Sequence, residues 1–184
     1  LGRSAKFNGD GYIYWFDVDS SRLQQFRGLE ASYTIETWFR SVTLNDDYMT
    51  LFAAADSATT NHYIDILIDD EGYVVWRHTP RTSDNPLTYG QATEIQSVNK
   101  YAGAGETFHH LALVYNDLTK YMNMFVDGYI VASGTASGAI NDSCEIVMGK
   151  KGPSENDNYF RGYLDDFRIW NLSLIHISEP TRPR

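Results

Sequence analysis

Carboxylates grouped on one β-strand are the first chemistry to consider, because strand alternation can aim several acids at one cleft. Glycosidic bond cleavage uses two such acids, one as nucleophile or base and the other as general acid. The segment Tyr63-Ile64-Asp65-Ile66-Leu67-Ile68, which has the composition of a strand, carries one acid. Asp65 alone cannot perform both steps. The sequence therefore predicts no glycosidase site.

Other catalytic motifs are also missing from the sequence. Cys144 is the only cysteine, and neither Ser133 nor Ser137 lies in the Gly-x-Ser-x-Gly turn that exposes a nucleophile. His109 and His110 are adjacent, so on a regular strand their imidazoles point to opposite faces and cannot chelate one metal ion. We therefore predict that the protein is not an enzyme.

Aromatic rings and short polar side chains could instead form a sugar-binding surface. Flat rings stack on pyranose faces, while Asn, Asp and Arg hydrogen-bond to hydroxyl groups, and the chain has 13 Tyr and 4 Trp for this purpose. The candidates on predicted loops and strand ends are Tyr48, Tyr89, Tyr129 and Tyr159, with Asn156, Asp157, Asn158 and Arg161 as polar partners. The alternative is that these tyrosines only fit a pleated, half-buried sheet surface.

Acidic loops offer ligands for Ca²⁺, which binds several carboxylate, amide and carbonyl oxygens. The segments Asn45-Asp46-Asp47 and Asn156-Asp157-Asn158 have this composition. Asp165 is a third candidate, because on a regular final strand it shares a face with Phe167 and Ile169. A carboxylate buried among apolar groups needs a cation or hydrogen-bond donors, so we expect Asp165 to have such a partner.

The elements that must position these residues are β-strands. Short aromatic and β-branched runs with a period of two are separated by Gly, Asn and Asp, a pattern typical of sandwiches and barrels. In the segment 32–40, one face carries Tyr33, Ile35, Thr37 and Phe39, and the other carries Thr34, Glu36, Trp38 and Arg40. We expect this segment to be a half-buried strand.

Turn signals predict how the other strands are connected. The expected hairpins pair 63–68 with 73–76, through Asp69-Asp70-Glu71-Gly72, and 121–126 with 129–132, through Asp127-Gly128. The further expected strands are 111–115, 145–148 and 164–170. The polar stretch 79–105 is predicted to form long loops around one edge strand.

Composition limits the class of protein. The chain has 184 residues and 42% hydrophobic content, which suits a single globular domain. Its net charge of −9 disfavours nucleic-acid binding and anionic membrane surfaces, because both require Lys and Arg. One cysteine excludes an internal disulfide, and no apolar run is long enough for membrane insertion. The start at Leu1 leads us to expect a fragment of a larger protein.

Five segments resemble a known family when taken in order. They are Ala5-Lys-Phe-Asn-Gly-Asp-Gly-Tyr12, Tyr33-Thr-Ile-Glu-Thr-Trp-Phe39, Phe108-His-His-Leu-Ala-Leu-Val-Tyr115, Phe125-Val-Asp-Gly-Tyr-Ile-Val-Ala-Ser-Gly134 and Gly162-Tyr-Leu-Asp-Asp-Phe-Arg-Ile-Trp-Asn171. Together they resemble the laminin G-like, concanavalin A-like lectin/glucanase family of the jelly-roll type that includes pentraxins. The resemblance implies an all-β fold over 1–171, an antiparallel β-sandwich of two packed sheets.

The resemblance also implies a function. We expect a non-catalytic recognition module that binds a glycan or glycoprotein, next to other domains of the same polypeptide, in an extracellular or cell-surface protein. The alternatives are a structural or adhesion spacer without a ligand and, with less support, a glycoside hydrolase. Glycosidases of the same fold carry their acids in a Glu-x-Asp-x-x-Glu arrangement. In the nearest candidate here, the segment 63–68, Tyr63 and Ile68 stand where that arrangement has its glutamates. In relatives an Asp matching Asp165 helps to hold a structural Ca²⁺ ion, and Asp10 could supply the other side. The competing interpretation pairs Asp165 with an Arg or with backbone N–H groups.

The C-terminal segment 172–184 does not continue the pattern. From Leu172 to Arg182 it resembles one reading frame of a transposase-type sequencing adapter. We therefore expect 172–184 to be a non-native tail, disordered or loosely packed, and exclude it from the fold prediction. The alternative is a genuine C-terminal extension.

Overall fold

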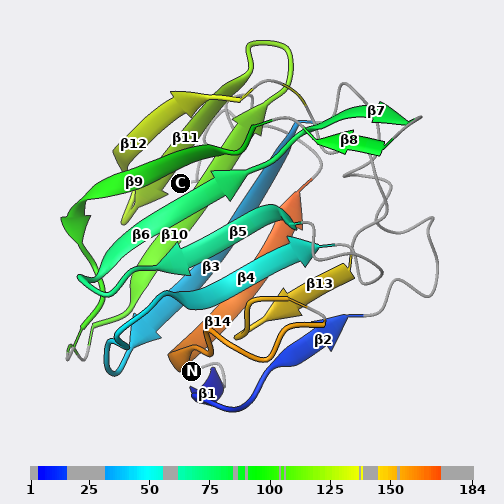
Figure 1. Ribbon diagram of the computed structural model, residues 1–184. Coiled ribbons are helices and arrows are strands. Elements are labelled where there is room, and N and C mark those ends of the chain that lie inside the picture. Colours follow the sequence, from blue (N-terminus) through cyan, green and yellow to red (C-terminus); the bar gives the residue numbers. More distant parts are fainter. Residues whose placement is uncertain are drawn as a thin grey trace, which may run out of the picture.

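Fourteen β-strands form the regular structure of the part of the chain that the computed structural model describes (Figure 1). That part comprises residues 4–15, 32–55, 62–84, 87–89, 91–103, 105, 107–136, 138, 145–152 and 154–170. The strands are β1 (Ala5–Asn8), β2 (Ile13–Trp15), β3 (Tyr33–Ser41), β4 (Met49–Ala55), β5 (His62–Ile68), β6 (Tyr73–His78), β7 (Arg81–Asp84), β8 (Leu87–Tyr89), β9 (Thr93–Lys100), β10 (His109–Asn116), β11 (Tyr121–Val126), β12 (Tyr129–Thr135), β13 (Glu145–Met148) and β14 (Arg161–Trp170).

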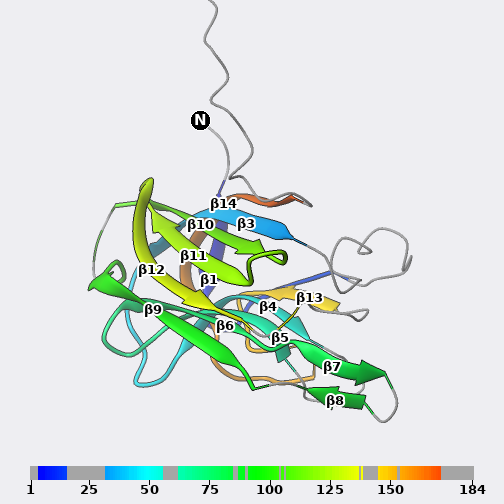
Figure 2. The same cartoon turned by 90° about the horizontal axis from the view of Figure 1, so that it is seen from above.

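Two antiparallel sheets of six strands pack face to face, as Figure 2 shows from above. The first sheet has the order β1-β14-β3-β10-β11-β12, and the second has the order β2-β13-β4-β5-β6-β9. The all-β antiparallel sandwich predicted from the sequence is therefore confirmed. The predicted tail at 172–184 and Cys144 lie outside the described residues.

Both predicted hairpins are present. In the β5–β6 turn the Asp69 carboxylate accepts the backbone N–H groups of Glu71, at 3.1 Å, and of Tyr73, at 2.8 Å. In the β11–β12 turn both central residues have positive φ, 53° at Asp127 and 82° at Gly128. This conformation matches the primed turns that connect two-residue hairpins, so the Asp-Gly signal identified the correct turn.

The stretch 79–105 contains more structure than the sequence predicted. β9 is the expected edge strand of the second sheet. In addition, β7 and β8 pair with each other as a small two-stranded sheet separate from both main sheets. Backbone hydrogen bonds hold this pair together, and they require no apolar alternation that could be recognised in the sequence.

The core lies between the two sheets and follows the predicted alternation of β3. Tyr33, Ile35 and Phe39 are buried in it, whereas Trp38 on the opposite face of the strand is 41% exposed. The largest fully buried side chain is that of Trp76 on β6. The inner face of each sheet is thus mainly apolar, and the outer face of the first sheet carries polar and exposed aromatic groups.

The final strand differs from the prediction because β14 contains a bulge. Asp165 pairs with Trp38 and Arg168 pairs with Glu36, so β14 has one more residue than β3 between these two pairs. Asp166 lies in this bulge with φ of 52°. The extra residue reverses the alternation, and Phe167 packs inward against the core, whereas Asp165 lies on the outer face beside Trp38. The predicted burial of Asp165 on the face of Phe167 and Ile169 is therefore wrong.

Candidate functional site

Two exposed tryptophans lie on the outer face of the first sheet. Trp38 of β3 is 41% exposed and Trp170 of β14 is 42% exposed. Trp170 pairs with Thr34, four residues before Trp38 on β3, so the two positions are roughly 13 Å apart along the strand direction. We call this surface, formed by Trp38, Trp170, Glu36, Arg168 and His110, the aromatic face.

Glu36 is the centre of the hydrogen-bond network on the aromatic face. Its carboxylate accepts the indole N–H of Trp170 at 3.0 Å and a guanidinium N–H of Arg168 at 3.5 Å. The Nε2 atom of His110 lies 3.7 Å from its other oxygen. Arg168 also donates to Asp166 at 2.6 Å. The network fixes the orientation of the Trp170 ring and places donors and acceptors between the tryptophans.

The aromatic face continues along β3 toward the end of the sheet. The Trp38 and His110 rings lie with their centroids 5.1 Å apart, at an interplanar angle of 53°. Two residues further on, the Arg40 guanidinium lies 4.4 Å from the Tyr163 ring centroid and 5.4 Å from that of Phe108. The result is a strip of rings and polar groups that follows the strand direction.

The predicted separation of the two adjacent histidines is confirmed. His110 faces outward against Trp38, whereas His109 packs its ring 5.9 Å from that of Phe39 on the inner side of the strand. The Nδ1 atom of His109 donates to the Asp127 carboxylate at 2.7 Å. The two imidazoles thus contribute to different surfaces.

Asp65, which the sequence predicted to be insufficient for catalysis, belongs to an ion-pair cluster on the second sheet. His62 donates from Nδ1 to Asp65 at 2.6 Å and from Nε2 to Glu155 at 2.5 Å. Lys151 lies 2.9 Å from Glu155. We call His62, Asp65, Glu155 and Lys151 the His62 cluster. The hydrogen bond between His62 and Glu155 connects the start of β5 to the segment between β13 and β14.

Electrostatics in the His62 cluster favour the charged forms. Burial alone would lower the pKa of His62, but the hydrogen bonds and charges of Asp65 and Glu155 outweigh it and raise that pKa. Burial would likewise raise the pKa of Glu155, yet Lys151 and His62 hold it below its ordinary value. A hydrogen bond to Glu155 raises the pKa of Lys151. The cluster therefore stabilises the local structure as an ionised network.

The outer side of the second sheet is covered over much of its centre. Ala53, Leu67 and Val75 point away from the core there, and each is at most 3% exposed. Arg77 and Glu94 at its margin remain accessible, with 33% and 46% of their side chains exposed. This side therefore presents charged groups at its edge in place of an open aromatic surface.

The loop before β4 and the segment between β13 and β14, which hold several predicted ligand residues, lie against each other. The side-chain amide of Asn45 donates to the backbone oxygen of Tyr159 at 3.2 Å. The N–H of Thr50 donates to the backbone oxygen of Asn158 at 2.8 Å. Tyr159 donates its hydroxyl to Asn156 at 3.5 Å. Tyr48, in the loop before β4, has the Arg77 guanidinium 4.7 Å from its ring centroid.

Three of the predicted ligand residues whose side chains are described do not join a common site. Arg161 packs against Gly9 beside β1, and Asp157 faces Lys151 at 3.7 Å. Tyr129 is 76% exposed at the tip of the β11–β12 hairpin. Tyr89 lies in β8, and its side chain is outside the described part of the structure. The ligand roles of the predicted residues stay a prediction.

The structure places Asp10 and Asp165 beyond opposite ends of β1, and the metal role predicted for them stays a prediction. Ala5 pairs with Leu164 and Asn8 with Arg161, so Asp165 lies beyond the start of β1 and Asp10 beyond its end. At about 3.3 Å per residue, more than roughly 13 Å of strand separates them. Asp165 accepts the N–H of Asp166 at 2.9 Å, which is the backbone partner of the competing interpretation. The described residues contain no group of three or more His, Cys, Asp or Glu placed to hold a metal ion.

Sequence reasoning identified Trp38 and Glu36 only as the outer face of a strand and did not select them as ligands. Their signal was present, because alternation places both on the solvent side of segment 32–40. Trp170, Arg168 and His110 were also missed, since their proximity to Glu36 depends on how three distant strands pair. Within the described residues the aromatic face combines exposed indoles with fixed donors and acceptors, a combination suited to binding.

An antiparallel sandwich of two six-stranded sheets is a fold class that both recognition domains and enzymes share. Within that class, the family model of the concanavalin A-like lectin/glucanases superfamily matches residues 7–176. The chain belongs to this superfamily, as the resemblance of the five segments had implied. A search of curated proteins finds no match.

Solved structures show the same fold in proteins of different origin. The CBM40 domain of a Ruminococcus gnavus sialidase, bound to α2,3-sialyllactose, has a TM-score of 0.69 at 13% identity, over 97% of this chain and 92% of that one. Domain 4 of an extracellular arabinanase from Geobacillus stearothermophilus, in complex with arabinotriose, has a TM-score of 0.64 at 19% identity, over 94% and 72%. Mouse laminin α1 domains LG4–5 have a TM-score of 0.62 at 16% identity, over 90% and 40%.

Proposed function

We propose that this domain is a non-catalytic recognition module that binds a glycan through the aromatic face. The observation that carries the proposal is the pair of tryptophans, 41% and 42% exposed, on the same outer face as Glu36, Arg168 and His110. Exposed indoles cost free energy in water, and stacking on a pyranose face would remove part of that apolar surface.

Polar groups between the rings would give the ligand its orientation. The Arg168 side chain is 49% exposed and that of His110 is 30% exposed, so both can reach a ligand, whereas Glu36 is 15% exposed and mainly holds its neighbours in place. Rigid donors and acceptors reduce the entropy lost on binding. The strip along β3 would suit an extended chain of sugars more than a compact ligand.

The relatives support the class of ligand. The sialidase domain was solved with a bound sialyllactose and the arabinanase domain with a bound arabinotriose. These ligands belong to those proteins, and at 13% and 19% identity the likeness establishes only the shared fold. We infer that the present domain uses the same fold for recognition of a glycan or glycoprotein.

We also infer that the domain is not a glycoside hydrolase. Asp65 is engaged with His62 in the His62 cluster, and the positions where paired acids would lie on β5 hold Tyr63 and Ile68. A hydrolase needs two carboxylates about 5 to 10 Å apart across the scissile bond. Release of reducing sugar from laminarin or a similar polymer is the direct check, and we expect none.

We place the domain in a larger extracellular or cell-surface protein. The arabinanase relative is described as extracellular, and the present chain spans 40% of the laminin fragment, which contains two domains. In the described residues no helix is long and apolar enough to cross a bilayer. In such a protein, the neighbouring domains of the same polypeptide would be partners of this domain.

A glycan array followed by calorimetry tests the proposal. We expect Trp38→Ala and Trp170→Ala each to weaken binding about tenfold, which corresponds to about 1.4 kcal/mol. Tyr12→Ala is the matched control, because Tyr12 is 49% exposed but precedes β2 of the second sheet, outside the network of Glu36. An array that stays silent with and without calcium would favour a spacer domain, whose exposed rings would pack against a neighbouring domain.

A further inference from the structure

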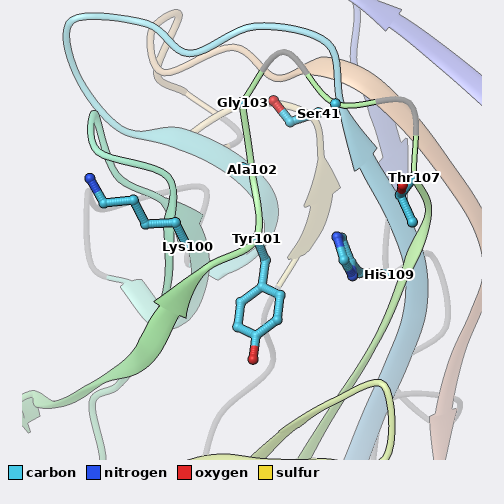
Figure 3. A pocket seen from close by; sticks show the side chains of 8 residues that line it. Ser41, Lys100, Tyr101, Ala102, Gly103, Thr107 and His109 are labelled. Carbon is cyan, nitrogen blue, oxygen red and sulfur yellow. The ribbon is translucent and has the colours of Figure 1, made fainter.

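A pocket of about 260 Å³ opens at the end of the sandwich, where the chain crosses from β9 in the second sheet to β10 in the first (Figure 3). The segment that follows β9 forms one side of it, and the ends of β3 and β10 form the other. Its lining includes Ser41, Tyr101, Gly103, Thr107 and His109. This pocket lies on the inner side of β10, away from the aromatic face.

The wall of the pocket is anchored to the neighbouring turn. The N–H groups of Tyr101 and Ala102 both donate to the backbone oxygen of Gly72, at 2.9 and 3.1 Å. Gly72 has φ of 97°, and a Cβ atom there would clash with the backbone oxygen of Ala102. Further along the same wall, the N–H of Gly105 donates to the backbone oxygen of Gly103 at 2.7 Å. The close approach thus depends on Gly72 and holds this wall in place.

Polar and aromatic groups converge on the pocket. Figure 3 shows Tyr101 and His109 side by side, with Thr107 near His109 and Ser41 near Gly103. The two rings make an edge contact, with centroids 5.3 Å apart. Ser41 donates its hydroxyl to the Thr43 oxygen at 2.7 Å and keeps its lone pairs as acceptors. His109 is oriented through Nδ1 by Asp127, which leaves Nε2 as its second polar atom.

The charged side chains that the described residues place around the pocket each have a partner. The Lys100 side chain points away from it in Figure 3, with its Nζ atom 3.7 Å from Glu71. Asp127 accepts from His109 through one oxygen and from the N–H of His110 through the other, at 2.7 and 2.9 Å. A charged ligand would therefore lose hydration and have to compete with these existing pairs, whereas a neutral polyhydroxy ligand would find hydroxyl, imidazole and ring partners.

We propose that this pocket is a second carbohydrate site, which takes one neutral sugar ring at the end of a chain. Its volume lies just below the roughly 300 to 1,000 Å³ of sites for drug-sized ligands, as expected for a single ring. The inference rests on the proposed glycan-binding function for the class of ligand, but it uses none of the residues of the aromatic face. The domain then has two binding surfaces, one for an extended chain and one for a terminal residue.

Amide chemical-shift titration of the ¹⁵N-labelled protein tests the second site. The probes are glucose, galactose, mannose and N-acetylglucosamine, with glucuronic acid and N-acetylneuraminic acid as anionic counterparts. We expect saturable shifts at Gly103, Gly105 and Thr107 with at least one neutral sugar and none with the anionic ones. Thr107→Val keeps the shape of an exposed side chain and removes one hydroxyl, so we expect roughly fivefold weaker binding.

The aromatic-face variant separates the two proposals. Trp38→Ala should leave the pocket shifts unchanged even where it abolishes binding of longer chains. Absence of saturable shifts with every neutral sugar, equal binding of anionic sugars, or shifts that Thr107→Val leaves unaltered would each overturn the pocket assignment. None of these results would bear on polysaccharide binding at the aromatic face, which the tryptophan variants test on their own.

Discussion

Acidification should destabilise this fold through the buried His78. The side chain is 0% exposed, its Nε2 atom donates to the backbone oxygen of Gly138 at 2.7 Å, and its Nδ1 atom accepts the Tyr33 hydroxyl at 2.8 Å. Its ring stacks on Tyr115 with centroids 4.6 Å apart. Burial lowers the pKa of His78 from 6.5 to about 4. The neutral imidazole is therefore part of the native core.

The size and sign of the effect follow from this shift. Between pH 6.5 and about 4 the unfolded chain protonates His78 while the folded chain does not, so the unfolded state binds more protons and stability falls as the pH falls. Each pH unit in this window corresponds to about 1.4 kcal/mol, which gives a loss of about 3 kcal/mol by pH 4. This is a large part of the about 5 to 15 kcal/mol that stabilises a typical domain.

Urea denaturation of the wild type and His78→Gln, at several pH values from 7.5 to 4, measures the loss. We expect the variant to be less stable at pH 7.5 but to lose about 3 kcal/mol less than the wild type on acidification. Glu155 and Asp127, whose pKa values are held below their ordinary 4.5 and 3.8, begin to lose their stabilising effect as the pH falls through those ordinary values, and they do so in both proteins. An NMR titration that places the pKa of His78 near 6.5, or equal losses in both proteins, would refute the reasoning.

Three further predictions concern the polar sites. The pKa of His62 is raised, so the stabilisation that protonated His62 gives the fold is complete below pH 6.5 and is lost as the pH rises through the raised pKa. Glu155→Gln should remove about 1 kcal/mol of this pH dependence, measured by thermal melts at several pH values. Asp165→Asn should leave the response of the melting temperature to calcium and chelator unchanged, because Asp165 lies on the outer face and accepts a backbone N–H. Tyr48→Ala should lower the free energy of unfolding by about 0.5 to 1 kcal/mol in urea denaturation, since its ring packs against Arg77.

Most of the fold could be predicted because its signals are local. The alternation of β3 identifies which side chains enter the core, and Asp127-Gly128 specifies the turn between β11 and β12. The β7–β8 pair could not be predicted in the same way, because a short sheet held by backbone hydrogen bonds imposes no apolar period. The positions of Asp10 and Asp165 depend on the register between β1 and β14, which joins residues far apart in the sequence.

The aromatic face depends on the bulge that the sequence pattern did not reveal. In a regular β14, Leu164 and Arg168 would share a face, so a strand with Leu164 in the core would turn Arg168 and Trp170 inward as well. The extra residue at Asp166, whose φ of 52° is tolerated by Asp better than by most residues, keeps Leu164 inside and moves Arg168 and Trp170 to the outer face. Only then can both reach Glu36, which lies more than a hundred positions away in the chain. Local alternation was therefore sufficient to place Trp38 and Glu36, whereas the other half of the surface required the bulge and the pairing of the last strand with β3.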